Sequence, residues 1–260
     1  MPHTSAQPLL RLNHVSLAFK GVKAISDIGF SVAHGEICAL IGPNGAGKSS
    51  LLNVINGVYS AQEGSIDFDG TTHRRLRPHQ AAELGIARTF QNIALFKSLS
   101  LLDNVLTGRN LLRRCHWLTQ ALGLPQARAE EDAQREAAER VIEFLHLQPW
   151  RNSIVGRLPY GLQKRVELAR ALAAEPRLLL LDEPMAGMNA EEKREMSHFI
   201  AETNREWGTT LVLIEHDIGV VMGLSDHVVV LDYGRKIGDG TPDEVRRNPE
   251  VIAAYLGTRH

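Results

Sequence analysis

The sequence predicts an α/β fold built around a largely parallel sheet, and three observations indicate it. Short apolar runs alternate with helical segments through most of the chain. Some runs, such as EICALIG, are almost continuously apolar, which is typical of strands buried on both faces of a parallel sheet. The chain has 260 residues, 43% hydrophobic and 23% charged, enough for one large domain or one domain with a subdomain.

The N-terminal third is expected to combine antiparallel and parallel strands. Residues 9–19 and 24–32 alternate apolar and polar side chains, so we predict half-buried antiparallel strands there. The buried run at residues 36–42 ends in glycine and predicts the first parallel strand. The elements expected next are a helix at 48–55, a strand and turn at 64–70, a short helix at 79–85 closed by Gly85, and a short strand at 86–90.

The character of the chain changes at residue 96. LLDNVLTG is typical of a helix, and a linker with Cys115, His116 and Trp117 follows it. Residues 126–147 are rich in Ala, Glu and Arg, with apolar residues at helical spacing. This block predicts a helical subdomain inserted in the α/β core.

The core is expected to resume after this insert. The remaining elements are a helix at 161–174, a strand at 178–181, a helix at 190–207, a strand at 210–214, a short helix after His216, a hairpin at 227–240 and two short capped helices at the end. We therefore predict one domain over residues 8–258, with core segments 8–95 and 162–258 and a helical subdomain at about 96–161, after a disordered leader of residues 1–7.

Composition excludes several classes of protein. The net charge of −1 gives no overall basic field that would recruit nucleic acid. Cys38 and Cys115 lie far apart in the sequence, which argues against a disulfide framework or a zinc site. There is no apolar core of signal-peptide length and no run near the roughly 20 residues that span a bilayer. We expect a cytoplasmic protein whose membrane role, if any, comes through a partner.

The stretch GPNGAGKS predicts a phosphate site. It fits the pattern GxxxxGK[ST], follows a buried strand and precedes a helix. Glycines let successive N–H groups surround phosphate oxygens, and the helix N-terminus adds partial positive charge. We expect Lys48 to reach the β- and γ-phosphates and Ser49 to ligate Mg²⁺. The predicted nucleotide-binding residues are Gly42, Pro43, Asn44, Gly45, Ala46, Gly47, Lys48, Ser49 and Ser50.

The stretch LLLLDEP predicts the second half of this site. Its leucines bury a strand, and Asp182 follows at the carboxyl end, where open α/β sheets bind ligands. Asp182 is expected to help hold Mg²⁺ through water, and Glu183 to polarise a water molecule for attack on the γ-phosphorus. Read alone, the two residues could be acids at an ordinary strand end.

These motifs, in this order, resemble the ATP-binding subunits of ABC transporters over residues 8–258. The resemblance implies a P-loop NTPase (RecA-like) core with an N-terminal antiparallel β subdomain and an inserted helical subdomain. It implies that Gln91, in TFQN, touches Mg²⁺ or the attacking water, and that His216, in IEHD, lies beside the γ-phosphate. MAGMN stands in the family's D-loop, with Asn189 where aspartate is usual. Phe19 lies about where an aromatic ring stacks on adenine, or it packs in a strand core.

Longer stretches resemble one branch of that family. ARTFQNIALFKSLSLLDNVLTG, EPMAGMN and VIAAYLG are similar to the longer ATPase subunit of branched-chain amino-acid importers. This implies a peripheral subunit on the cytoplasmic face of the inner membrane. Its implied partners are two membrane permeases, a second ATPase subunit and, indirectly, a solute-binding protein, with no nucleic acid.

One motif departs from the family pattern. LPYGLQ stands where the family has LSGGQ, which places Pro159 at the serine and Gly161 at the second glycine. In the family this stretch faces the ATP of the other subunit, so Gly161 is expected to bind nucleotide in trans. Proline suits a first helical turn but supplies neither a hydroxyl nor an N–H group. We expect a working contact that has lost one side-chain hydrogen bond.

Three other functions remain as alternatives. A related ABC system, such as lipid or lipopolysaccharide export, would share all these motifs. A soluble ABC protein that acts on ribosomes or DNA usually has two ATPase units or long coiled coils, which this chain lacks. A monomeric P-loop kinase would not need LPYGLQ, Gln91 and His216 together.

Overall fold

The computed structural model describes residues 7–112 and 125–256. They form two packing units: the described residues within 7–88, 177–184 and 197–256 make the first, and those within 89–112, 125–176 and 185–196 make the second. The expected leader falls almost wholly outside the described residues, as do Cys115, His116 and Trp117. The single domain over 8–258, with its subdomain at about 96–161, stays a prediction. The packing groups the helix at 160–172 with the helical unit, because it packs against the helix at 101–107.

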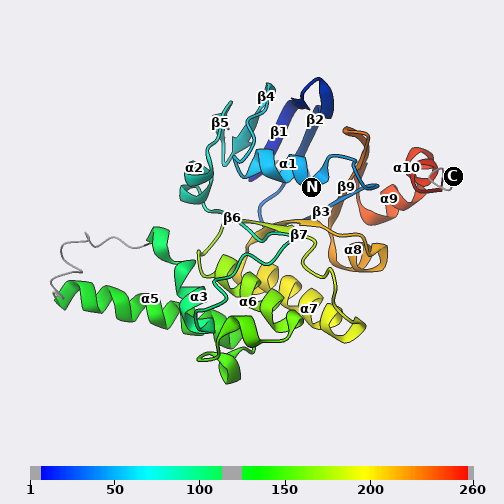
Figure 1. Cartoon of the computed structure of the whole chain (residues 1–260). Helices are drawn as coiled ribbons and strands as arrows, with labels where there is room; N and C mark the ends of the chain where they lie inside the picture. Colours follow the sequence, from blue (N-terminus) through cyan, green and yellow to red (C-terminus); the bar gives the residue numbers. More distant parts are fainter. Residues whose placement is uncertain (1–6, 113–124, 257–260) are drawn as a thin grey trace, which may run out of the picture. The chain divides into compact units, whose positions relative to one another are not determined.

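The first unit contains a six-stranded sheet in the order β10-β9-β3-β8-β7-β6 (Figure 1). Its strands are β3 (Ile37–Ile41), β6 (Ile86–Arg88), β7 (Leu178–Asp182), β8 (Thr210–Ile214), β9 (His227–Asp232) and β10 (Arg235–Gly240). All pairs are parallel except β9 with β10. Strands β3, β7 and β8 are buried along their whole length, which confirms the largely parallel α/β fold.

A second sheet of the first unit is antiparallel, with strand order β2-β1-β4-β5 (Figure 1). Its strands are β1 (Leu10–Phe19), β2 (Val22–Val32), β4 (Glu63–Phe68) and β5 (Thr71–His73). The short strand β5 was not predicted, since three polar residues give no periodic signal. One apolar cluster joins this sheet to α1 and to β3, and it includes Leu10, Ile25, Leu52 and Leu40. Burial of this apolar surface fixes the helix that follows the phosphate loop.

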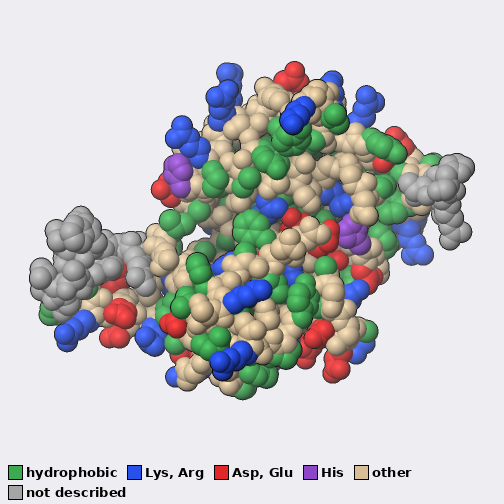
Figure 2. Space-filling model, in the orientation of Figure 1, with side chains coloured by type: hydrophobic (Ala, Val, Ile, Leu, Met, Phe, Trp, Pro, Cys, Tyr) green, Lys and Arg blue, Asp and Glu red, His purple; other side chains and the backbone are tan. Residues whose placement is uncertain are grey.

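Short helices complete the first unit. They are α1 (Lys48–Ile55), α2 (Pro78–Glu83), α8 (Ile218–Leu224), α9 (Pro242–Arg247) and α10 (Pro249–Leu256). The start of α9 is fixed by a capping box, in which Thr241 accepts the N–H of Glu244 and Glu244 accepts the N–H of Thr241. No helix among residues 7–112 and 125–256 has the length and hydropathy needed to cross a membrane. Figure 2 shows basic and acidic side chains interspersed over the visible face.

The second unit is helical. It contains α3 (Leu101–Thr107), the 3₁₀ turn η1 (Asn110–Leu112), α5 (Pro125–Phe144), the 3₁₀ turns η2 (Gln148–Trp150) and η3 (Val155–Arg157), and α6 (Tyr160–Leu172). Helix α7 (Ala190–Trp207) begins in this unit and ends in the first. Ser100 caps α3 by accepting the N–H of Asp103, as the LSLLDN stretch suggests.

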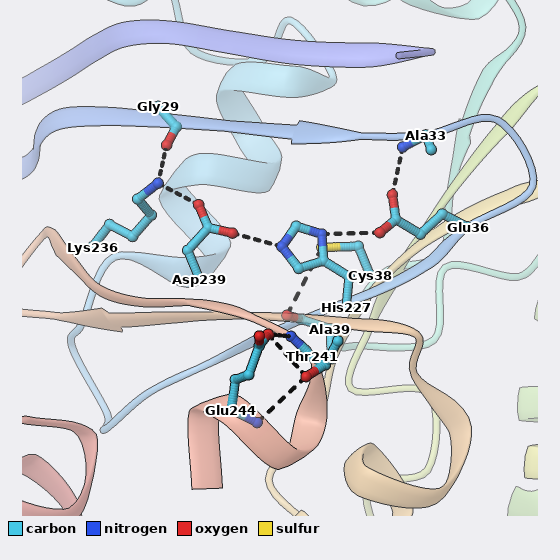
Figure 3. Close-up of polar contacts among 10 residues, drawn as sticks. All are labelled: Gly29, Ala33, Glu36, Cys38, Ala39, His227, Lys236, Asp239, Thr241 and Glu244. Carbon is cyan, nitrogen blue, oxygen red and sulfur yellow. Dashed lines mark hydrogen bonds and ion pairs between the residues drawn. The ribbon is translucent and has the colours of Figure 1, made fainter. Parts of the chain in front are cut away.

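A charged cluster lies at the end of the large sheet where β3 begins (Figure 3). His227 lies between two carboxylates: Nδ1 is 3.1 Å from Glu36 Oε1, and Nε2 is 2.7 Å from Asp239 Oδ1. Lys236 bonds Asp239 and donates to the carbonyl of Gly29 on β2. The cluster therefore ties both sheets of the first unit together. The Asp239 hydrogen bond, with that to Glu36, raises the pKa of His227 to about 12.

The His227 cluster predicts a pH-dependent stability. A histidine whose pKa is raised from 6.5 stabilises the fold fully below about pH 6.5, and this contribution is lost as the pH rises toward about 12. His227→Gln is expected to lower the free energy of unfolding by about 2–3 kcal/mol at pH 6, and by less at pH 10. Urea unfolding of both proteins at pH 6, 8 and 10 measures this.

The control for this prediction is His14→Gln. His14 Nδ1 also lies 2.7 Å from a carboxylate, that of Asp27, but the two side chains are 85% and 71% exposed. Exposed pairs of this kind contribute about 0–1 kcal/mol, so little change is expected at any pH. An equal loss for His227→Gln at pH 6 and pH 10 would mean that the proton on His227 is not what stabilises the fold.

Candidate functional site

The parallel strands bring the predicted motifs to one edge of the large sheet. The phosphate loop follows β3, His216 follows β8 two residues on, and Asp182 and Glu183 lie at the end of β7. Neighbouring parallel strands β3, β8 and β7 end at the same edge, where α/β sheets bind their ligands. The first unit therefore holds the phosphate loop, Asp182, Glu183 and His216 together.

The phosphate loop requires glycine at both of its ends. A Cβ at Gly42 would lie 2.0 Å from the carbonyl oxygen of Leu231, and one at Gly47 would lie 2.5 Å from that of Ala24. Both residues also have positive φ, 148° and 100°. A side chain at either position would push the loop away from the neighbouring backbone. Between them Asn44 and Gly45 are exposed, so the turn itself is accessible to a ligand.

Lys48 lies in the first turn of α1 and spans the loop. Its Nζ donates to the carbonyls of Gly42 at 2.7 Å and Pro43 at 3.0 Å. Burial lowers the pKa of Lys48, while the carboxylates of Glu183 and Asp182 act to raise it. The ammonium therefore bonds two carbonyls and also interacts electrostatically with the carboxylates of Glu183 and Asp182. The neighbouring Ser49 is exposed and Ser50 is half-buried.

Asp182 is buried, 3% exposed, and is bound through one oxygen only. Its Oδ2 accepts a hydrogen bond of 2.8 Å from Arg88. Its Oδ1 is buried and has no hydrogen-bond partner among the described residues. A buried, unsatisfied carboxylate oxygen beside a phosphate loop suits the water shell that Mg²⁺ retains, so the residues present fit that ion.

Glu183 and His216 form a direct pair. His216 Nε2 lies 2.8 Å from Glu183 Oε1, and the Glu183 side chain is 16% exposed. The backbone of Glu183 has a positive φ of 50°, and its N–H donates to the carbonyl of Ile214 at 3.0 Å. This unusual conformation follows β7 directly and re-aims the side chain toward His216. Sequence reasoning predicted both residues for catalysis, and the structure brings them together.

Phe19 lies at the exposed end of β1. Its side chain is 42% exposed and contacts Tyr59 edge-on, with ring centroids 5.0 Å apart. Of the two interpretations of Phe19, packing in a strand core does not fit this exposure. Stacking on adenine stays a prediction.

Gln91 belongs to the second unit, where its backbone is held by two buried charges. Lys164 Nζ donates to the carbonyl of Gln91 at 2.9 Å, and Glu167 Oε1 accepts the N–H groups of Phe90 and Ala94. Both charged side chains are 2% exposed and lie 3.8 Å apart. Burial raises the pKa of Glu167, against the effect of Lys164 and of the two N–H groups. The pair fixes the backbone of the Gln91 loop on helix α6, while the Gln91 side chain is exposed.

The altered motif LPYGLQ forms the start of α6. Pro159 is the N-cap residue, Tyr160 the first helical residue, and Gly161 is buried. A Cβ at Gly161 would lie 2.3 Å from Glu192 Oε1, so this position is crowded. Asn189 caps the next helix by accepting the N–H groups of Glu191 at 2.9 Å and Glu192 at 3.0 Å. An aspartate there could accept the same bonds, so asparagine keeps the cap without its charge.

Sequence reasoning missed three residues that hold these motifs: Arg88, Lys164 and Glu167. Arg88 ends a three-residue strand and gives no periodic signal. Lys164 and Glu167 lie within the helix predicted at 161–174, where a charged residue by itself indicates a solvent-facing position. The one available signal was their spacing of three, which places both on one face of α6 among apolar neighbours.

Comparison with known proteins agrees with this geometry. Residues 25–186 match the family model for ABC transporters, and residues 235–260 match that for branched-chain amino acid ATP-binding cassette transporters. BraF of Pseudomonas aeruginosa, a high-affinity branched-chain amino acid transport ATP-binding protein, is 37% identical over 97% of this chain and 99% of its own length. LivG of Escherichia coli, with the same description, is 36% identical over the same shares.

Solved structures give the same result. The crystal structure of the ADP conformation of MJ1267, an ATP-binding cassette of an ABC transporter, superposes with a TM-score of 0.83 and 31% identity, covering 97% of this chain and all of that one. A nucleotide-free cassette from an ABC transporter gives 0.82 and 30%, covering 96% and 99%. The sequence match extends through the phosphate loop and the Asp182–Glu183 pair, and the fold match covers both units. This chain belongs to the ATP-binding cassette family of ABC transporters.

Proposed function

We propose that this chain is the ATP-binding and hydrolysing subunit of an importer of branched-chain amino acids. The observation that carries the ATPase assignment is the Glu183–His216 pair, 2.8 Å apart, at the same sheet edge as the phosphate loop. The substrate class rests on the relatives, which are described as branched-chain amino acid transport ATP-binding proteins. The match of residues 235–260 to the corresponding family model supports the same class.

Nucleotide binding follows from the phosphate loop and α1. Backbone N–H groups of the loop and the N-terminus of α1 favour negative charge. The ammonium of Lys48 is partly desolvated and bonds two backbone carbonyls. A charged phosphate oxygen would stabilise it better than these neutral acceptors do. Phe19, at its exposed end of β1, supplies a ring for the adenine. Residues Gly42 to Ser50 are the binding segment.

Ser49 and Asp182, both in the first unit, are the residues that would hold Mg²⁺, Asp182 through water. A contact of Gln91 with the ion stays a prediction from the family resemblance. The ion, when bound, neutralises charge on the phosphate oxygens. Asp182 fits because its Oδ1 is buried and lacks a partner among residues 7–112 and 125–256. Ser49 fits because its side chain is exposed at the start of α1, beside Lys48.

Glu183 acts on the attacking water as a general base. One carboxylate oxygen, Oε1, is occupied by His216. Glu183 takes a proton from the water molecule while the water oxygen bonds the γ-phosphorus. The bond between the γ-phosphorus and the bridging oxygen breaks, and ADP leaves with that oxygen. His216 holds the carboxylate in place and is positioned to sense the γ-phosphate.

The assembly is proposed to contain two such subunits. In the closed pair, Gly161 and the start of α6 of one subunit would bind the γ-phosphate of the other. The chain would be peripheral, on the cytoplasmic face of the inner membrane, and would act through two permeases. A solute-binding protein would deliver the solute to these permeases.

Purification from the native membrane tests this function. A tagged chain should recover two permeases and a second ATPase subunit. In proteoliposomes with the solute-binding protein, addition of leucine, isoleucine or valine should stimulate ATP hydrolysis. Stimulation by a lipid and not by these amino acids would favour an exporter, and recovery with ribosomes and no permease would contradict the transporter assignment.

A further inference from the structure

Arg88 makes a buried contact with Asp182. Its Nη2 donates to Asp182 Oδ2 at 2.8 Å, and its Nη1 donates to Asn53 Oδ1 at 2.5 Å. The Arg88 and Asp182 side chains are 6% and 4% exposed. Three elements thus meet at one guanidinium: the end of β6, the end of β7 and helix α1, which begins at Lys48.

A carboxylate this deeply buried needs a nearby cation. Removing one partner of a buried ion pair is strongly destabilising, because the remaining charge is left uncompensated. Lys48 donates to carbonyl oxygens of the loop. The cation that hydrogen-bonds Asp182 is Arg88. Asn53 orients the guanidinium by accepting a hydrogen bond from its other terminal nitrogen, Nη1.

We propose that Arg88 is a resident counter-cation of Asp182 that keeps the site folded without metal and weakens its affinity for Mg²⁺. The proposal rests on the proposed function, in which Asp182 helps hold Mg²⁺. Arg88 occupies Oδ2 and leaves Oδ1 without a partner among the described residues, so the ion can be accommodated while Arg88 stays bound. Two cations that share one carboxylate repel each other, which lowers the affinity of the second. Arg88 acts on the ion only through Asp182 and is not a catalytic residue.

The alternative is that Arg88 only stabilises the fold. Both roles predict that Arg88→Met lowers the thermal stability of the metal-free protein. They differ in the response to Mg²⁺. A merely structural residue leaves the Mg²⁺ requirement unchanged, an orienting residue raises it when removed, and a counter-cation lowers it.

The test is thermal unfolding of the full chain with excess ATP, first in EDTA and then over a Mg²⁺ titration. Arg88→Met is expected to lower the midpoint in EDTA by about 5–10 °C. Mg²⁺ should then raise the midpoint of Arg88→Met. The free Mg²⁺ concentration that gives half of this rise should be lower than in the parent protein, on the order of fivefold. Arg88→Lys keeps the charge and should need about as much Mg²⁺ as the parent protein.

The matched control is Arg177→Met. Arg177 also pairs with an aspartate of the first unit, Asp69, at 2.6 Å, but both side chains are 46% exposed. It should change neither the midpoint in EDTA nor the Mg²⁺ titration.

An unchanged or raised Mg²⁺ requirement in Arg88→Met overturns the proposal. Should that variant not fold, Arg88→Met combined with Asp182→Asn must fold, since both charges are then gone; failure of the double variant also overturns it. A parent protein that ATP and Mg²⁺ do not stabilise would instead contradict the proposed function.

Discussion

Glu183→Gln is expected to lower ATP hydrolysis by roughly 10²–10⁴-fold while ATP still binds. Glutamine has the size of glutamate and can still bond His216, which lies 2.8 Å from Oε1 in the parent protein. It cannot take a proton from water at neutral pH, so the chemical step alone is lost. ATP binding should persist because the phosphate loop is untouched. The ATP-bound pair of subunits should therefore accumulate.

Two measurements check this result. Phosphate release by the assembled transporter gives the rate, and ATP-dependent association of the isolated subunit gives the bound state. Glu191→Gln is the control, since Glu191 is an exposed acid near the start of α7. Hydrolysis within threefold of the parent in Glu183→Gln would exclude Glu183 as the base. A kinase acting as a monomer would show no association and would transfer phosphate to an acceptor.

The sequence predicted much of the fold because burial leaves a strong periodic signal. Strands β3, β7 and β8 are buried throughout and mostly apolar, and the helix predicted at 190–207 coincides with α7. The site followed for the same reason. Once the strands are parallel, the residues after them must meet at one edge. This is why Glu183 and His216 meet although they are 33 positions apart. The role of His216 itself was predicted from the family resemblance.

The supporting contacts could not be predicted in the same way. Arg88, Lys164 and Glu167 are charged, and an isolated charge in a sequence indicates solvent. Their burial is set by partners 73 to 94 positions away, such as Asp182 for Arg88 and the Gln91 carbonyl for Lys164. The position of Glu192 could not be predicted either. Its carboxylate lies close to Gly161 and leaves little space for a side chain at that position of the altered motif.

Gly161→Asp is expected to lower ATP hydrolysis by the assembled transporter at least about 100-fold, with ATP binding to the subunit's own loop unchanged. Aspartate at this position would place a negative charge at the start of α6, against the γ-phosphate of the other subunit. It would also crowd Glu192, because a Cβ at Gly161 would lie 2.3 Å from Glu192 Oε1. Gly161→Ala separates these effects, since it adds the Cβ without the charge and should cost less.

A second comparison isolates the cause further. Glu192→Ala removes the side chain that crowds position 161. If crowding causes the loss, ATP hydrolysis should recover in the double variant Gly161→Asp, Glu192→Ala. If the negative charge of the aspartate causes it, the double variant should stay inactive. Pro159→Ser should raise hydrolysis at least about tenfold, because the hydroxyl restores a hydrogen bond to a charged group worth about 1.5–3 kcal/mol. The Pro159 N-cap lies outside the regular helix, so α6 should remain folded. If Pro159→Ser and Gly161→Asp both left the rate unchanged, α6 would begin near no nucleotide, and the altered motif would be a helix cap alone.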